Sequence, residues 1–184
     1  AKRFGVKRTA ASLDELLETD IDAVALFTPR HMHGSQALAA LHAGKHVYSA
    51  VPPTVDMESL EELVTTVRET GLTHMLAETS LFYPQVFYCR RRFEAGDFGD
   101  FAYAESQYMH DLGHFSVYRD YLETGDERFR RDAGMPPMLY STHSISMPLA
   151  VTGAHVTEVM CMGFEDRADD KVYGPGNNHW NNPF

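Results

Sequence analysis

The sequence predicts an α/β protein whose first part is a partial doubly wound parallel sheet and whose second part begins another domain. Helical and short apolar segments alternate three times before residue 80, with connections of only a few residues. Such alternation is typical of a parallel sheet covered by helices. The pattern changes at the turn 96–99, after which an aromatic, alternating segment begins. We therefore expect one domain over residues 1–99 and the start of a second over residues 100–184.

Capping and breaking residues place the elements of the first domain. Ser12 followed by Glu15 has the spacing of a capping box and predicts a short helix. The continuous apolar run 22–28, closed by Pro29, suits a strand that is buried on both faces of a parallel sheet. The remaining predicted elements are a helix from His33 to Gly44, a strand over 46–50, a helix from Asp56 to Gly71 and a strand over 73–79.

The second part of the chain has fewer regular patterns. A helix over 84–95 leads into the turn 96–99, and the alternating segment 101–110 predicts a strand. The charged loop 111–137 is long enough to suggest a functional or partly ordered segment. A helix over 143–151 and a strand over 157–164 are expected to follow.

Composition limits the classes of partner and compartment. With 43% hydrophobic residues the chain can bury a core, and a net charge of −10 argues against binding to nucleic acid, which requires clustered basic residues. The apolar runs are too short to cross a bilayer, so no membrane association is expected. Two cysteines favour a reducing compartment, and we expect a cytoplasmic protein.

Two stretches of the chain resemble the Gfo/Idh/MocA oxidoreductases. The first consists of Asp22-Ala23-Val24, Thr28-Pro29, His33 and Ala43-Gly44-Lys45-His46-Val47. The second runs from Pro136 through His143 to Gly153. The resemblance implies a Rossmann domain joined to an α+β domain with an open, mostly antiparallel sheet, which often mediates contacts in a homo-oligomer. It also implies NAD or NADP as cofactor and a sugar, cyclitol or related polyol as substrate.

The phosphate-binding part of such a cofactor site does not occur in this sequence. A Gly-x-Gly-x-x-Gly turn between a first strand and a helix is found nowhere in the 184 residues. We therefore expect the chain to be an internal fragment that is preceded in the full protein by about two strands and a helix.

Two departures from the family pattern concern the catalytic residues. The family usually has Glu-Lys-Pro where this chain has Ala50-Val51-Pro52, so Val51 replaces a lysine that orients the reacting hydroxyl. It often has an aspartate four residues before its catalytic histidine, and here that position is Leu139. The resemblance therefore points to a divergent subgroup of the family. Tyr140 and Glu105 are both open alternatives for the missing polar partner.

The resemblance nevertheless indicates a set of site residues. His143 is the favoured acid–base residue, because an imidazole titrates near neutrality, and Tyr140 is its catalytic neighbour. Glu105 and His110 are candidate substrate-binding residues. The candidate cofactor-binding residues are Thr28, Pro29, His33, Ala50, Val51, Pro52 and Thr79. No metal is expected, because the spacing of the histidines and carboxylates matches no compact metal motif.

Three functions are consistent with these observations. The first is an NAD(P)-dependent oxidoreductase that acts on a polyol by hydride transfer. The second is a non-catalytic ligand-binding or assembly module of the same fold, suggested by the loss of both the lysine and the aspartate. The third uses the cofactor for transient oxidation during hydrolysis of, or elimination from, a glycoside.

Overall fold

A computed structural model describes residues 2–109, 120, 123–127, 131, 135, 137–165, 167, 174 and 176–181 of the chain. The chain divides into two compact units, Ala1–Ala77 and Glu78–Phe184. The first unit ends before the boundary predicted at residue 99, so the assignment of residues 78–99 to the first domain stays a prediction.

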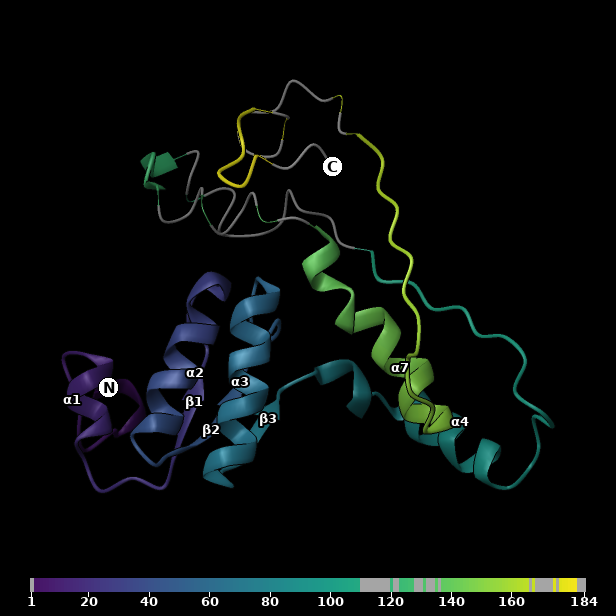
Figure 1. Ribbon diagram of the computed structural model, residues 1–184, viewed down its shortest axis with the longest axis horizontal. Coiled ribbons are helices and arrows are strands. Elements are labelled where there is room, and N and C mark those ends of the chain that lie inside the picture. Colours follow the sequence, from purple (N-terminus) through teal and green to yellow (C-terminus); the bar gives the residue numbers. More distant parts are fainter. Residues whose placement is uncertain are drawn as a thin grey trace. The chain divides into compact units, whose positions relative to one another are not determined.

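A parallel three-stranded sheet forms the centre of the first unit. Its strands are β1 (Ala23–Leu26), β2 (His46–Ser49) and β3 (His74–Leu76), in the order β1-β2-β3. Val24 lies opposite Val47, and Val47 lies opposite His74. The helices α2 (His33–His42) and α3 (Met57–Thr70) connect the strands and lie side by side against the sheet (Figure 1). This arrangement is a partial Rossmann fold, as predicted.

The core of the first unit lies between the sheet and these two helices. One correction follows, because β1 was expected to be buried on both faces, whereas Ala23 and Ala25 are exposed and only Val24 and Leu26 are buried. The helices cover one face, so alternate side chains point away from the core. A short run of apolar residues does not specify how many faces are covered. The buried core residues are Val24, Leu26, Ala37, Ala40, Leu41, Val47 and Leu63.

Local signals in the sequence fix the ends of the helices. Ser12 caps α1 (Leu13–Leu17), and its hydroxyl accepts a hydrogen bond from the backbone of Glu15. Asp56 caps α3 in the same way through Ser59 N, at 2.7 Å. At the other end, Gly71 adopts a left-handed conformation with φ of 68°, which a glycine adopts without steric cost. The short 3-10 helices η1 (Lys2–Phe4) and η2 (Arg30–Met32) complete this unit.

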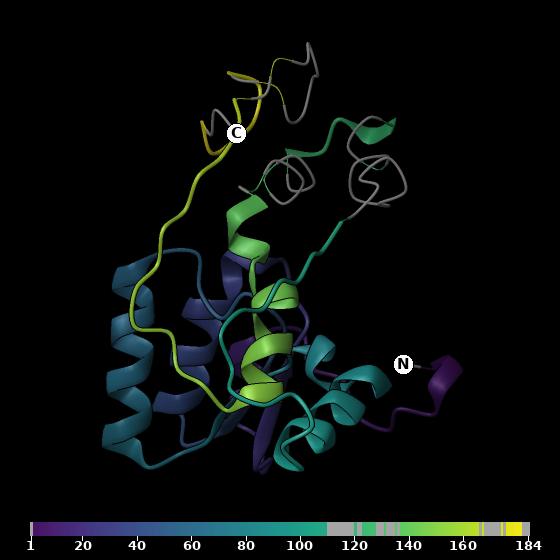
Figure 2. The same ribbon diagram turned by 90° about the vertical axis from the view of Figure 1, so that its right-hand side faces the viewer.

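Two helices pack together in the second unit. They are α4 (Pro84–Glu94) and α7 (Thr142–Thr152), which lie against each other in both views (Figure 2). Short 3-10 helices precede each of them, η3 (Thr79–Phe82) and η5 (Pro137–Tyr140). Both long helices were predicted, and α7 ends at Gly153 in a left-handed conformation, as α3 does at Gly71.

The two strands predicted in the second part are absent from the described residues. Neither 101–109 nor 157–164 forms a β-ladder, and both segments are drawn as open trace in Figure 1. Alternation of apolar and polar residues specifies the two faces of a strand, but a strand also needs a hydrogen-bonding partner. The second domain's antiparallel sheet therefore stays a prediction, and most of the expected loop 111–137 lies outside the described residues.

A proline inside α7 leaves a carbonyl group of the helix free to bond with residues 101–109. Pro148 has no N–H, so the carbonyl of Ser144, one turn earlier, lacks its helical donor. The Ser106 hydroxyl donates to that carbonyl oxygen at 2.7 Å. The lost helical bond is thus replaced by a contact that ties residues 101–109 to α7.

Candidate active site

The predicted cofactor residues of the first unit gather at one edge of its sheet. Thr28 and Pro29 follow β1, and Ala50, Val51 and Pro52 follow β2. Because the two strands are parallel neighbours, their carboxyl ends meet at the same edge, and Ala50 N donates to Leu26 O at 3.0 Å. In open α/β sheets, ligands bind outside the carboxyl ends of the strands.

His33 joins the two loops at this edge. Its side chain is 1% exposed, with Nδ1 2.7 Å from Pro52 O and Nε2 2.8 Å from Thr28 O. A neutral imidazole has a single N–H, so it donates to one of these two carbonyl oxygens. With both nitrogens directed at backbone groups, His33 supports the edge from within the fold.

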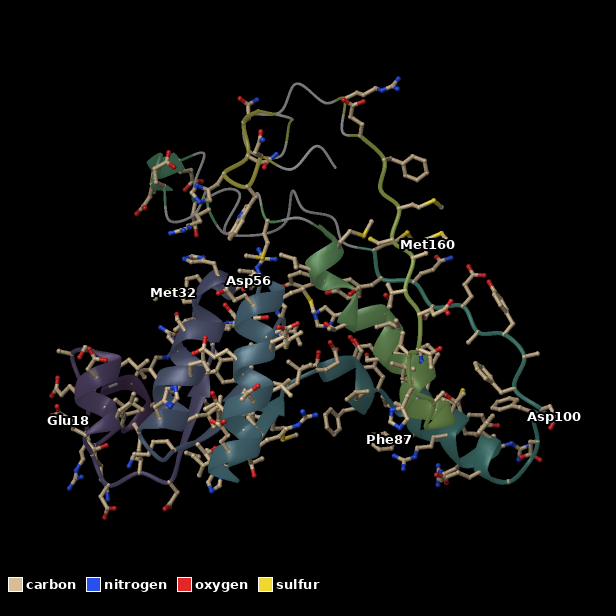
Figure 3. The ribbon with its side chains drawn as sticks, viewed as in Figure 1. Glu18, Met32, Asp56, Phe87, Asp100 and Met160 are labelled. Atoms are coloured by element: carbon tan, nitrogen blue, oxygen red, sulfur yellow. The ribbon has the colours of Figure 1, made fainter. Side chains whose placement is uncertain are left out.

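The edge presents exposed polar groups beside the amino-terminal ends of two helices. Thr28 and Pro29 are exposed, and the Thr28 hydroxyl donates to Gln36 Oε1 at 2.5 Å. The amino-terminal ends of α2 and α3 lie at one end of the helix pair, where Figure 3 labels Met32 and Asp56. The edge thus presents exposed groups from the loops, with the buried His33 behind them.

A carboxylate and an imidazole form a buried pair in the second unit. Glu78 directly follows the sheet-forming part of the chain, and His143 lies in the first turn of α7. His143 Nδ1 is 2.8 Å from Glu78 Oε1, and the two side chains are 12% and 2% exposed. The same carboxylate oxygen accepts a hydrogen bond from Ser80 N at 2.8 Å. A longer contact of 3.5 Å joins His143 Nδ1 to Ser80 Oγ.

The surroundings of Glu78 favour its ionised form. Burial raises the pKa of Glu78, but hydrogen bonds from Ser80, His143 and Thr142 and the charge of His143 outweigh burial, so the net pKa lies below its ordinary value of 4.5. An ionised carboxylate only accepts hydrogen bonds. The Nδ1 atom of His143 is therefore the donor in the contact with Glu78.

The second carboxylate oxygen has no well-formed hydrogen bond. Glu78 Oε2 and Thr142 Oγ1 are both buried, and neither has a partner within hydrogen-bond geometry. Thr142 is nevertheless near enough to help lower the pKa of Glu78. The pair is thus held firmly on the Oε1 side and more loosely on the Oε2 side.

Two tyrosine rings flank His143. The ring centroids of Tyr108 and Tyr140 lie 4.6 and 5.2 Å from that of His143. The two tyrosine rings are nearly parallel, with an interplanar angle of 14° and centroids 6.4 Å apart. Burial, followed by the nearby Tyr140, Tyr83 and Glu78, raises the pKa of Tyr108. Its phenol therefore stays protonated around neutrality and can donate a hydrogen bond.

The other predicted residues of the second unit lie apart from this pair or outside the description. Glu105 accepts hydrogen bonds from Tyr103 and Gln107, at 3.2 and 3.0 Å. It lines an apolar groove of about 590 Å³ between α4, α7 and the segment 98–106. Thr79 is exposed between the buried Glu78 and Ser80, and His110 lies outside the described residues.

Glu78 is the residue that sequence reasoning missed. Tyr140 and Glu105 were considered as polar partners of His143, and the structure brings Tyr140 to the histidine as an aromatic neighbour. The carboxylate comes instead from a residue 65 positions earlier. A usable signal was present, because Glu78 lies at the carboxyl end of the predicted strand 73–79, and functional side chains collect at the carboxyl ends of parallel strands.

The described residues form neither a metal-binding cluster nor a membrane-spanning helix. Within residues 2–109 and the later described segments, no group of three or more His, Cys, Asp or Glu side chains could hold a metal ion. None of the helices in this part of the chain is both long and apolar enough to span a bilayer.

The chain is similar in sequence to known oxidoreductases. Residues 1–78 match the Gfo/Idh/MocA family model, an oxidoreductase family with an NAD-binding Rossmann fold. A 4-carboxy-2-hydroxymuconate-6-semialdehyde dehydrogenase from Sphingobium is 37% identical over 98 residues, which cover 53% of this chain and 31% of that protein. A glycosyl hydrolase family 109 protein from Shewanella amazonensis is 31% identical over 139 residues, which cover 76% of this chain and 30% of that protein.

A solved structure extends the likeness to three dimensions. The scyllo-inositol dehydrogenase from Lactobacillus casei, crystallised with NAD(H) and scyllo-inositol, superposes with a TM-score of 0.51 at 31% identity. The superposition covers 54% of this chain and 30% of that one, so the chain spans about a third of the length of these relatives. Residues 1–78 thus belong to the Gfo/Idh/MocA oxidoreductase family and form part of its NAD-binding Rossmann fold.

Proposed function

We propose that the protein carrying this chain is an NAD(P)-dependent oxidoreductase that acts on a sugar, cyclitol or related polyol, with His143 as its acid–base residue. The observation that carries the proposal is the buried Glu78–His143 pair, because a carboxylate that holds one nitrogen of an imidazole prepares the other for proton transfer. Support also comes from the relative solved with NAD(H) and scyllo-inositol, a cyclitol.

The roles of the remaining residues follow from their positions. Thr28, Pro29 and Ala50 to Pro52 would form the wall beside the nicotinamide, and His33 would hold these loops together. The bound cofactor would supply the oxidant that accepts hydride from the carbinol carbon. Tyr140 and Tyr108 would present aromatic faces and phenol groups, which suit the apolar faces and hydroxyls of a sugar or cyclitol ring. Thr79, Glu105 and His110 are further candidates for ligand contacts.

A second function has a specific observation in its favour. The relative from Shewanella amazonensis is a glycosyl hydrolase family 109 protein, and its alignment covers 76% of this chain. Cleavage of a glycoside through transient oxidation would use the same cofactor wall and the same base. It would give released sugar without net accumulation of reduced cofactor.

One assay distinguishes these functions. The protein is incubated with NAD or NADP and a panel of sugars, cyclitols and their glycosides, and both reduced nicotinamide and released sugar are measured. We expect reduced nicotinamide to accumulate with at least one polyol, and to fall about tenfold or more in His143→Ala, because general acid–base catalysis contributes ~10²–10⁴-fold. His155→Ala, which changes an exposed histidine of the same unit, should keep the wild-type rate.

Other outcomes overturn the proposal in different ways. Sugar release without reduced cofactor would favour the glycoside reaction. Binding of a polyol without any turnover would favour a non-catalytic module, the function suggested by Val51 and Leu139. Full turnover in His143→Ala would remove this histidine from the role of acid–base residue.

A further inference from the structure

We propose that Glu78 is the positioning residue of His143 and replaces the helical carboxylate that is absent at Leu139. The inference rests on the proposed function of His143 and adds a residue that neither the family motif nor the helix pattern indicates. In the structure the partner of the histidine comes from the end of a strand region instead of from its own helix.

The geometry fixes which nitrogen is available for chemistry. Glu78 is ionised and 2% exposed, so its Oε1 accepts a hydrogen bond from His143 Nδ1 at 2.8 Å. A neutral imidazole with its proton on Nδ1 has a free lone pair on Nε2. Nε2 is therefore the atom that takes a proton from the substrate.

The carboxylate is itself held in place. Ser80 N donates to the same oxygen, Oε1, at 2.8 Å, and residues 78 to 80 enter the short helix η3. A buried carboxylate with a fixed backbone donor has little freedom to rotate, so it restricts the ring plane of His143 as well as its tautomer. The rings of Tyr108 and Tyr140 also contact the imidazole, in tilted orientations.

The proton transfer balances with the proposed oxidation. The O–H bond of the substrate breaks, and an N–H bond forms at His143 Nε2. The proton on Nδ1 stays with the ring and keeps its hydrogen bond to Glu78, which stabilises the positive charge that develops on the imidazole. The bound nicotinamide would supply the oxidant that takes the hydride of the carbinol C–H bond, so the carbinol would become a carbonyl.

A direct test reads the tautomer of His143 without any turnover. Ring nitrogens that carry a proton and those with a free lone pair give well-separated ¹⁵N NMR signals, and the His143 signals are those lost in His143→Gln. At a pH where the ring is neutral, we expect the proton on Nδ1 in the wild type. We expect it to redistribute toward Nε2 in Glu78→Met, which keeps side-chain length but offers no carboxylate.

Kinetics provide the second measurement. We expect kcat to fall about tenfold or more in Glu78→Met with little change in KM, because positioning of a base acts on the transition state more than on substrate binding. Glu78→Gln should be intermediate, since its amide oxygen can still accept from Nδ1–H without a charge. This graded rescue separates positioning from a general loss of packing.

The outcomes for the two proposals are distinguishable. A wild-type protein that oxidises polyols but carries the His143 proton on Nε2 overturns the role of Glu78 and leaves the proposed function intact. An Nδ1 tautomer that depends on Glu78, in a protein without oxidoreductase activity, overturns the proposed function and supports the positioning role. The wild-type spectrum alone can contradict the inference, so the test remains decisive even if the Glu78→Met variant fails to fold.

Discussion

Glu78 and His143 lie 65 positions apart in the sequence, yet Glu78 Oε1 and His143 Nδ1 are 2.8 Å apart and both side chains are largely buried. A buried charge is tolerated when it is paired and hydrogen-bonded, and the Ser80 backbone supplies the additional donor. This pair therefore couples the structural stability of the second unit to protonation.

The pH dependence of stability should follow from the lowered pKa of Glu78. At pH values between the pKa of Glu78 in the folded protein and its ordinary pKa of 4.5, the unfolded state binds more protons than the folded state. The stabilisation from Glu78 is therefore complete above its pKa in the unfolded chain, and it is lost as the pH falls through its pKa in the folded protein. We expect the free energy of unfolding to decline less steeply on acidification in Glu78→Gln than in the wild type.

Urea unfolding at a series of pH values from neutrality downward measures this difference. Glutamine does not titrate, so residue 78 adds no pH dependence to the stability of the variant. The difference between the two proteins at neutral pH gives the part of the substitution's effect that does not depend on pH. Parallel declines of the wild type and Glu78→Gln would contradict the linkage.

His33 should contribute to stability through its two backbone contacts. The change His33→Leu keeps a side chain of similar bulk but removes the contacts with the carbonyl oxygens of Thr28 and Pro52. We expect a loss of about 1–3 kcal/mol in the free energy of unfolding, because a neutral ring donates to one of these carbonyls and an unpaired buried carbonyl costs ~1–3 kcal/mol. His42→Gln, on an exposed histidine of the same helix, should change stability by less than about 0.5 kcal/mol. Equal effects of the two changes would remove the bridging role of His33.

The Ser106 hydroxyl should matter only while residue 148 is proline. Ser106→Ala removes the donor to Ser144 O and should cost about 1 kcal/mol in the native context. In a Pro148→Ala background, the new N–H at residue 148 can donate to Ser144 O, so the same serine change should cost close to nothing. A double-mutant cycle measured by thermal unfolding gives this coupling, and additive effects would show that the two donors do not substitute for each other.

Most of the helices and strands followed from local chemistry that can be read along the chain. Ser12, Asp56 and Gly71 mark helix ends because their side-chain oxygens, or the absence of a Cβ atom, satisfy requirements of the backbone within a few residues. The parallel order of the first unit followed from the alternation of helices and apolar runs. Local patterns were not sufficient for the strands predicted at 101–110 and 157–164, because a strand must form hydrogen bonds with a partner that is distant in the sequence.

The sequence by itself determined the fold of the first unit, the family resemblance and the candidate histidines, since each of these rests on residues that are close together along the chain. Only the tertiary structure decided that β1 is covered on one face, that His33 faces two carbonyl oxygens and that His143 pairs with Glu78. These features require side chains from separate segments to meet at hydrogen-bond distance, and such meetings are fixed by packing, which no local pattern specifies.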